Sequence, residues 1–339
     1  AYTWYQHDHS LYLRAMYTNC SRVEPMTPLL ILGYNRPEKL IQILKSIGSN
    51  PPEVLVVALD GPIKNEASDE LKVAQCIAHV KSENWAPTVV TRFRTEHLGL
   101  RSAVTDAITW TMNEYGRAII VEDDVIIGPQ FLEYMTFMLD KHENDFYVAQ
   151  INGYSQVPPR SSTPLATASR YSKYPTSCAW ATWKSRWNEY DDNLTWGRSV
   201  SIKSLSEQVG SVIGAIKWKI NFDDAAKSRV DSWAIRWVST IWSNNWMTIY
   251  PNQNLVYHDG RKDGTHTRTQ PKWVENEIGH IAEKLWKMNT DLISQTNHQE
   301  KWLKRNVFRE TLYGVIRGCV ASLLLQCILK WNSLRKKDV

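Results

Sequence analysis

The sequence predicts an α/β protein with a mostly parallel central sheet. Short apolar segments alternate along the first half of the chain with amphipathic segments of ten or more residues, which is the pattern of strands and crossover helices. Several apolar segments end in polar residues, and ligands of such sheets bind at that edge. Neither G-x-G-x-x-G nor G-x-x-x-x-G-K-[ST] occurs, so neither a dinucleotide fold nor a P-loop is indicated.

The expected elements follow from hydrophobic periodicity. The expected strands are rich in Val, Ile and Leu, and they are Leu29–Tyr34, Val54–Leu59, Thr88–Arg92, Ala118–Val121 and Tyr147–Asn152, with a strand-like pair over Met247–Tyr257. The expected helices of the first half are Glu38–Ile47, Ser68–Ser82, Gly99–Tyr115 and Phe131–His142. The helix over Glu38–Ile47 follows the turn Asn35-Arg36-Pro37, because proline favours the first position of a helix.

Three consecutive acids, Glu122, Asp123 and Asp124, stand where the fourth strand should end. Adjacent carboxylates beside an apolar strand repel one another unless a cation or a set of donors offsets their charge. A divalent cation held by one or two carboxylates, with phosphates and water as its other ligands, suits this arrangement. The alternative is a strand followed by an acidic turn, since short acid clusters are common at the ends of elements.

Composition narrows the class of protein. The 339 residues suggest one or two domains, and 43% hydrophobic with 22% charged residues excludes a disordered or collagen-like chain. The 16 tryptophans are consistent with binding of sugars or of a membrane interface, because indole rings have apolar faces and a polar N–H group. Alternatively, many of them lie in the core. Five widely spaced cysteines without C-x-x-C favour reduced thiols in the cytoplasm over disulfides or zinc. No signal peptide is visible, and an upstream anchor stays open.

The net charge of +5 is unevenly distributed. Residues 301–339 hold nine Lys/Arg against two Asp/Glu, an excess of +7, so the rest of the chain is net −2. The part that carries the motifs therefore offers no basic stripe, and nucleic acid is not expected as a partner.

Seven motifs occur in a fixed order, and together they carry a resemblance: LLILGYNRPEKL, VVALDGP, HLGLRSAVTDAITW, AIIVEDDVIIGPQFLEYM, CAWATWKSRWNEYD, DSWAIRW and DGTH. From about Pro28 to Thr267 the chain resembles bacterial nucleotide-diphospho-sugar glycosyltransferases of the GT-A fold, in or near glycosyltransferase family 2, of the surface-polysaccharide type. It resembles the Golgi N-acetylglucosaminyltransferases more distantly. The resemblance implies a single Rossmann-like domain at residues 28–270, after an extension at 1–27 and before a C-terminal helical region at 271–339.

The resemblance also implies site residues. Glu122-Asp123-Asp124 matches the D-x-D-type motif whose last acid contacts Mn²⁺ or Mg²⁺, and His266 matches a residue near the metal and the diphosphate. Asp60 matches the acid that binds the base or ribose of the donor, beside the turn Asn35-Arg36. The usual Asn-Ile-Gly-Phe before the histidine is replaced here by Tyr257–Gly260, which makes the approach to His266 uncertain.

For three further residues the alternatives stay open. Asp231 matches the general base by resemblance, but Asp231-Ser232 opens a helical stretch, so Asp231 is alternatively its N-cap. Arg101, near the start of its helix, binds phosphate or is a surface charge. Trp180, with its neighbour Trp183, stacks on a sugar or packs in the core.

The function implied is a metal-dependent, inverting glycosyltransferase that moves a sugar from a nucleotide-diphosphate donor, UDP on family grounds, to a glycan or lipid-linked acceptor. One carboxylate base suffices for inversion, whereas two flanking carboxylates are the glycoside hydrolase pattern. A sugar nucleotidyltransferase would need a glycine- and Lys/Arg-rich loop after the first strand, and Gly33–Pro37 is too short and too poor in glycine. A non-catalytic sugar-binding or scaffold protein is the third alternative.

The apolar run Val315–Leu329 has basic residues on both sides. Its longest stretch free of charge, Gly318–Leu329, is shorter than the roughly 20 residues that span a bilayer. The sequence therefore predicts a segment that binds the cytoplasmic face of an anionic membrane peripherally, with a helix docked on protein as the alternative.

Overall fold

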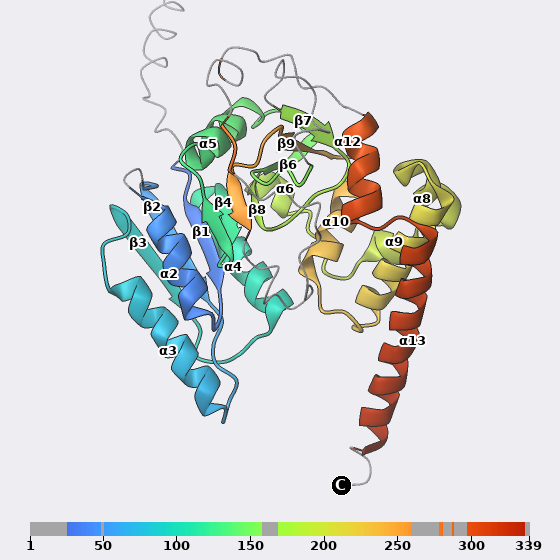
Figure 1. The fold of residues 1–339 in the computed structure, drawn as a ribbon, viewed down its shortest axis with the longest axis horizontal. Coiled ribbons are helices and arrows are strands. Elements are labelled where there is room, and N and C mark those ends of the chain that lie inside the picture. The colour runs from blue at the N-terminus through green and yellow to red at the C-terminus, as the bar shows by residue number, and fades with distance from the viewer. Residues whose placement is uncertain are drawn as a thin grey trace, which may run out of the picture.

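The computed structural model describes residues 26–48, 51–157, 169–258, 278–280, 287 and 297–335. Its centre is an eight-stranded sheet of order β3-β2-β1-β4-β8-β6-β9-β7 (Figure 1). The strands are β1 (Leu29–Gly33), β2 (Val54–Leu59), β3 (Thr88–Phe93), β4 (Arg117–Glu122), β6 (Val148–Asn152), β7 (Ser169–Ser172), β8 (Ala179–Trp183) and β9 (Met247–Pro251). The N-terminal extension expected at residues 1–27 lies outside the described ranges except for residues 26 and 27. His266 also lies outside them.

The first half of the sheet is parallel. Strands β3, β2, β1 and β4 pair in parallel with continuous registers, and helices α2 (Pro37–Ser46), α3 (Ala67–Lys81) and α4 (Leu100–Tyr115) connect them. All six residues of β2 are buried, as expected of a parallel strand covered on both faces. The prediction of an α/β protein with a mostly parallel sheet is confirmed, and the arrangement is compatible with a Rossmann-like domain.

The second half of the sheet is mixed. Strand β8 lies antiparallel between β4 and β6, β9 pairs parallel with β6, and β7 closes the edge antiparallel to β9. All five residues of β8 are buried. The Trp-rich segment that contains β8 is therefore a central strand of the sheet.

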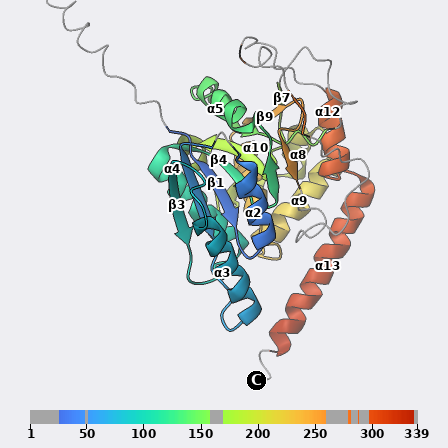
Figure 2. The ribbon, with the colours of Figure 1, turned by 60° about the vertical axis from the view of Figure 1, so that its left-hand side comes forward.

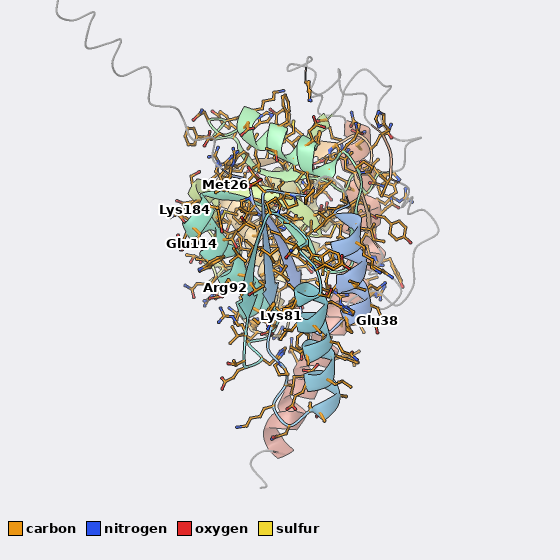
Figure 3. The ribbon with its side chains drawn as sticks, turned by 90° about the vertical axis from the view of Figure 1, so that its left-hand side faces the viewer. Met26, Glu38, Lys81, Arg92, Glu114 and Lys184 are labelled. Carbon is orange, nitrogen blue, oxygen red and sulfur yellow. The ribbon has the colours of Figure 1, made fainter. Side chains whose placement is uncertain are left out.

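Helices cover both faces of the sheet. Helices α2, α3 and α5 (Phe131–Lys141) lie on one face, and α4, α9 (Val212–Ala226) and α10 (Trp233–Ser243) lie on the other. In Figure 3, Glu38 of α2 and Glu114 of α4 lie on opposite sides of the strands. Strand side chains alternate between the two cores, as Ile31 and Leu30 illustrate.

A second, two-stranded sheet and several short helices complete the described part. Strand β5 (Val125–Ile127) pairs antiparallel with β10 (Val256–His258). The remaining helices are α6 (Lys184–Trp187), α7 (Thr195–Ser199), α8 (Ile202–Val209), α12 (Asn297–Trp302), the π-helix η2 (Leu303–Val307) and α13 (Leu312–Arg335). Helix α13 packs along α9 and forms one side of the molecule (Figure 2). Among the helices of the described ranges, none is long and apolar enough to cross a membrane.

Candidate functional site

The three acids form the turn between β4 and β5, at the carboxyl edge of the sheet. Asp123 and Asp124 are buried, and Glu122 is partly exposed. Arg36 lies beside them because β1 and β4 are parallel neighbours, so that the turn after β1 reaches the turn after β4. The guanidinium donates to both oxygens of Asp123, from Nε to Oδ2 at 3.3 Å, and from Nη1 to Asp124 Oδ2 at 3.1 Å.

One guanidinium does not balance the charge of this turn. Burial and the charges of Asp124 and Asp123 raise the pKa of Glu122 to about 8. Burial also raises the pKa of Asp123 to about 6, although Arg36 opposes the shift. Both pKa values rise mainly because burial disfavours the ionised carboxylate, and the neighbouring acids add to the shift. A divalent cation would supply further positive charge.

A histidine that the sequence did not indicate lies beside the acids. Strand β10 places His258 opposite Val125 in the two-stranded sheet. Its Nε2 is 3.5 Å from Asp124 Oδ1, and its ring stacks on Tyr154 with centroids 5.9 Å apart. The pairing of β10 with β5 joins distant parts of the chain, and the only sequence signal is the strand-like segment that ends just before His258. The expected histidine, His266, lies outside the described residues.

The donor atoms of this cluster fit a hard divalent cation. Asp124 Oδ1 is buried and has no hydrogen-bond partner among the described residues, and it faces His258. Carboxylate oxygens are the preferred ligands of Mg²⁺, which keeps its remaining positions for water and phosphate. Within the described ranges, however, no group of three His, Cys, Asp or Glu side chains is arranged to hold a metal by itself. The described side chains alone therefore do not form a complete metal site.

A cavity of about 330 Å³ opens beside the acid turn. Glu122, His258 and Tyr154 line it. Trp218 of α9 and Phe308, just after η2, are also lining residues. The first turn of α10 forms part of the wall through residues 234 and 235. The lining of the cavity therefore includes a carboxylate together with aromatic residues, of which Trp218 is almost completely buried.

Asp60, at the end of β2, holds the loop that leads into α4. Its carboxylate accepts hydrogen bonds from the backbone N–H groups of Gly61 (2.9 Å), Leu98 (2.9 Å) and Gly99 (3.1 Å), and Nδ1 of His97 lies at 2.9 Å. A carboxylate has about four lone-pair sites, and these four contacts use them. The resemblance implied that the Asp60 carboxylate binds the base or ribose of the donor. In this structure the carboxylate instead positions the loop that leads into α4.

Asn35 is also held by a protein contact. Its Nδ2 donates to Asp69 Oδ1 at 2.5 Å, and the hydroxyl of Tyr34 donates to Asp69 Oδ2 at 2.5 Å. Asp69 lies in the first turn of α3 and also accepts from the N–H of Ile63 at 2.7 Å. The turn after β1 is therefore fixed to α3, and this fixes the position of Arg36.

Asp231 lies on the surface at the start of α10. Its carboxylate is 56% exposed and accepts from Arg101 Nε at 2.7 Å, while Arg101 Nη1 donates to Asp192 at 2.5 Å. The N-cap of α10 is Ser232, whose hydroxyl accepts from the N–H of Ile235 at 3.3 Å. The alternative that Asp231 is the N-cap of this helix is therefore wrong, and its role as a general base stays a prediction.

Trp180 is a core residue, which corrects the expected sugar contact. Its side chain has no exposed area, and its ring stacks on Trp233 with centroids 5.6 Å apart. Trp187 and Trp237 contact it as well. No face of the indole is open to a ligand. Trp180 and Trp187 fill the core between β8 and α10, whereas Trp183 packs in the core on the opposite face of the sheet.

The structure thus brings Arg36, Glu122, Asp123, Asp124 and His258 together at one edge of the sheet. A second group, Arg101 with Asp231 and the loop held by Asp60, borders the start of α10. Residues 234 and 235, in the first turn of α10, line the same cavity as Glu122. No protein-family model matches this chain, and no curated protein matches it either.

Proposed function

We propose that this chain is a metal-dependent, inverting glycosyltransferase that uses a nucleotide-diphosphate sugar as its donor. The observation that carries the proposal is the acid turn Glu122–Asp124 at the carboxyl edge of a parallel sheet, with Asp123 and Asp124 buried. It has one arginine for three acids and opens on a cavity. Such edges bind ligands, and buried acids in excess of their basic partners suit a cation that itself binds phosphate. The resemblance of the seven ordered motifs supports the same function.

The residues have distinct parts in the proposed reaction. Asp124 and Glu122, with His258 beside Asp124, would hold Mn²⁺ or Mg²⁺, which neutralises the negative charge of the diphosphate leaving group. Arg36 fixes the two aspartates and adds one positive charge to the same edge. Asp231 takes the proton of the acceptor hydroxyl as the oxygen of that hydroxyl forms a bond to the anomeric carbon. The bond to the diphosphate then breaks on the opposite face, which inverts the anomeric centre.

The cavity supports a sugar as the group that is bound. Its wall contains the aromatic residues Trp218 and Phe308 together with the carboxylate of Glu122. Sugars are amphipathic in this sense, with apolar ring faces and polar edges. The turn after β1 does not suit a triphosphate, since Tyr34 and Asn35 are fixed to Asp69 and no glycine-rich loop is present. This argues against the nucleotidyltransferase alternative.

The test is release of nucleoside diphosphate from a panel of UDP-, GDP- and dTDP-sugars with Mn²⁺, with and without glycan and lipid-linked acceptors. A transferase releases the diphosphate faster when the acceptor is present. We expect Asp124→Asn and excess chelator to abolish the release. Asp223→Asn, the same change on exposed α9, should leave it intact.

Other outcomes separate the alternatives. Release of pyrophosphate from a nucleoside triphosphate and a sugar phosphate identifies a nucleotidyltransferase. Binding of sugars without release of any nucleotide identifies a sugar-binding protein. Full activity of Asp124→Asn, or of the wild type in chelator, excludes the proposed metal-dependent reaction.

A further inference from the structure

Helix α13 docks on the protein with its polar face. The Ser322 hydroxyl donates to Asp224 Oδ1 at 2.7 Å and accepts from Arg229 Nη1 at 3.1 Å. Arg229 and Asp224 form an ion pair at 2.8 Å beneath it. One turn earlier on the same face, Gly318 lies close to Lys217 and Ile220 of α9. The side of α13 that carries Gly318 and Ser322 therefore faces α9 and the residues just after it.

The opposite face of α13 is apolar and exposed. Six large apolar side chains are each more than half exposed, and they are Leu312, Tyr313, Ile316, Val320, Leu323 and Leu324. At about 100° per residue they fall within an arc of roughly 120°. Exposed apolar residues scattered singly need no explanation, but a continuous stripe along one helix marks an interaction surface. We refer to these six residues as the outer face of α13.

The charge around the outer face is positive. Helix α13 contains Arg317, Lys330 and Arg335 and no Asp or Glu. Arg317 is exposed and, at about 140° on the same helical projection, lies next to the edge of the outer face. Figures 1 and 2 show that the C-terminal half of α13 extends past α9, away from the sheet. The outer face is therefore an accessible apolar stripe with a basic border.

We propose that the outer face of α13 lies in the surface of an anionic membrane, with its apolar side chains among the acyl chains and Arg317 at the phosphates of the headgroups. An amphipathic helix with a basic border binds such a surface in plane, without crossing it. A second copy of this chain is the less suitable occupant. Two outer faces brought together would juxtapose basic residues with no acid on either helix to pair with them.

This placement orients the cavity of the proposed active site. Phe308 lines that cavity and precedes the outer face by one turn of chain, and Glu310 between them accepts from Trp218 Nε1 at 2.8 Å. Because Phe308 is part of the cavity wall, a membrane along the outer face would lie near that wall, and a lipid-linked acceptor would enter from that side. This last step rests on the proposed function, whereas the membrane contact itself does not.

The test is co-sedimentation of the full chain with vesicles of phosphatidylcholine, with and without phosphatidylglycerol. We expect binding to the anionic vesicles and weak binding to the neutral ones. The double variant Ile316→Gln/Leu323→Gln should bind the anionic vesicles at least roughly tenfold more weakly than the wild type, because two apolar side chains can no longer be buried in the membrane. Arg317→Gln should weaken binding about fivefold, and added salt should reduce that difference.

The matched control is Ile63→Gln/Leu71→Gln, which changes an exposed isoleucine and an exposed leucine far from α13. It should bind as the wild type does, and circular dichroism verifies that both double variants are folded. Asp124→Asn should also bind normally, so failure of the membrane proposal is distinguishable from failure of the enzyme proposal. Absence of wild-type binding, equal binding to neutral vesicles, or normal binding by Ile316→Gln/Leu323→Gln overturns the proposal. Dimerisation that this variant abolishes would assign the outer face to a second copy instead.

Discussion

Arg101 donates from Nε to Asp231 Oδ1 at 2.7 Å, and this contact joins the first turn of α4 to the residue before the N-cap of α10. Arg101 holds a second carboxylate, Asp192, at 2.5 Å. The two acids differ in position, because Asp231 also lies near Gly99, which the Asp60 carboxylate holds. Asp231 is therefore linked to the carboxyl edge of the sheet, whereas Asp192 also contacts Arg236 of α10 at 3.5 Å.

The first prediction separates these two acids. Asp231→Asn should reduce kcat by roughly 10²–10⁴-fold and leave donor affinity unchanged, because an amide cannot accept the proton of the acceptor. Asp192→Asn is the matched control and should keep kcat within a few-fold. Neither change should alter the free energy of unfolding by more than about 1 kcal/mol, since exposed ion pairs contribute little. Equal effects of the two substitutions on kcat would show that only the arginine matters.

The second prediction concerns pH and metal. The pKa of Glu122 is raised from its ordinary value to about 8, so the folded state binds the proton more tightly than the unfolded state. The stability that this group contributes is present below about pH 4.5 and is lost as pH rises through about 8. A divalent cation competes with that proton, so the rise in Tm caused by Mn²⁺ should be larger at about pH 8 than at about pH 6.

Thermal denaturation of Glu122→Gln provides the control for this second prediction. The glutamine has no proton to lose, so the metal-free variant should lose less stability between about pH 6 and 8 than the wild type does. Identical pH dependence in both proteins would mean that Glu122 is ionised throughout this range and that its environment is already neutralised.

The third prediction concerns Asp60. An asparagine at this position keeps one acceptor oxygen, and its NH₂ group would oppose the N–H of Gly99 and the ring of His97. Asp60→Asn should therefore destabilise the protein by about 1–3 kcal/mol, the cost of unsatisfied buried groups. Amide hydrogen exchange at Leu98 and Gly99 should be faster. Asp106→Asn, an exposed acid on α4, is the control and should leave this exchange unchanged.

The parts of the fold that could be predicted from the sequence have local signals. The strands β1, β2 and β4 are continuous apolar runs, and the helices between them are periodic, so the parallel half of the sheet follows from the pattern. The acid turn could be located for the same reason, because Glu122–Asp124 interrupts an apolar run. Arg36 could be placed beside it once β1 and β4 were expected to end at one edge.

The remaining features depend on pairings between distant segments. Strand β8 resembles an aromatic binding surface in sequence, and only its insertion between β4 and β6 buries its tryptophans. The position of His258 follows from the pairing of β10 with β5, which no local pattern indicates. The inward direction of Ser322 on α13 likewise depends on Asp224 and Arg229 of a different segment. Periodicity shows that a helix has a polar face and an apolar face, but it does not show which of the two faces packs against the rest of the protein.

The last prediction tests the role of Trp180. Its ring is enclosed by Trp187, Trp233 and Trp237, so Trp180→Ala should leave a cavity in the core and cost roughly 3–5 kcal/mol of unfolding free energy in a urea titration. Trp110→Ala is the control, since Trp110 is partly exposed on α4 under Arg92 and should cost less. A sugar-binding tryptophan behaves in the opposite way, because its loss raises KM while stability changes little. We expect the loss of stability, because the Trp180 side chain is completely buried in the core. Unchanged stability of Trp180→Ala together with a raised KM would contradict this expectation and would show that substrate contacts the indole.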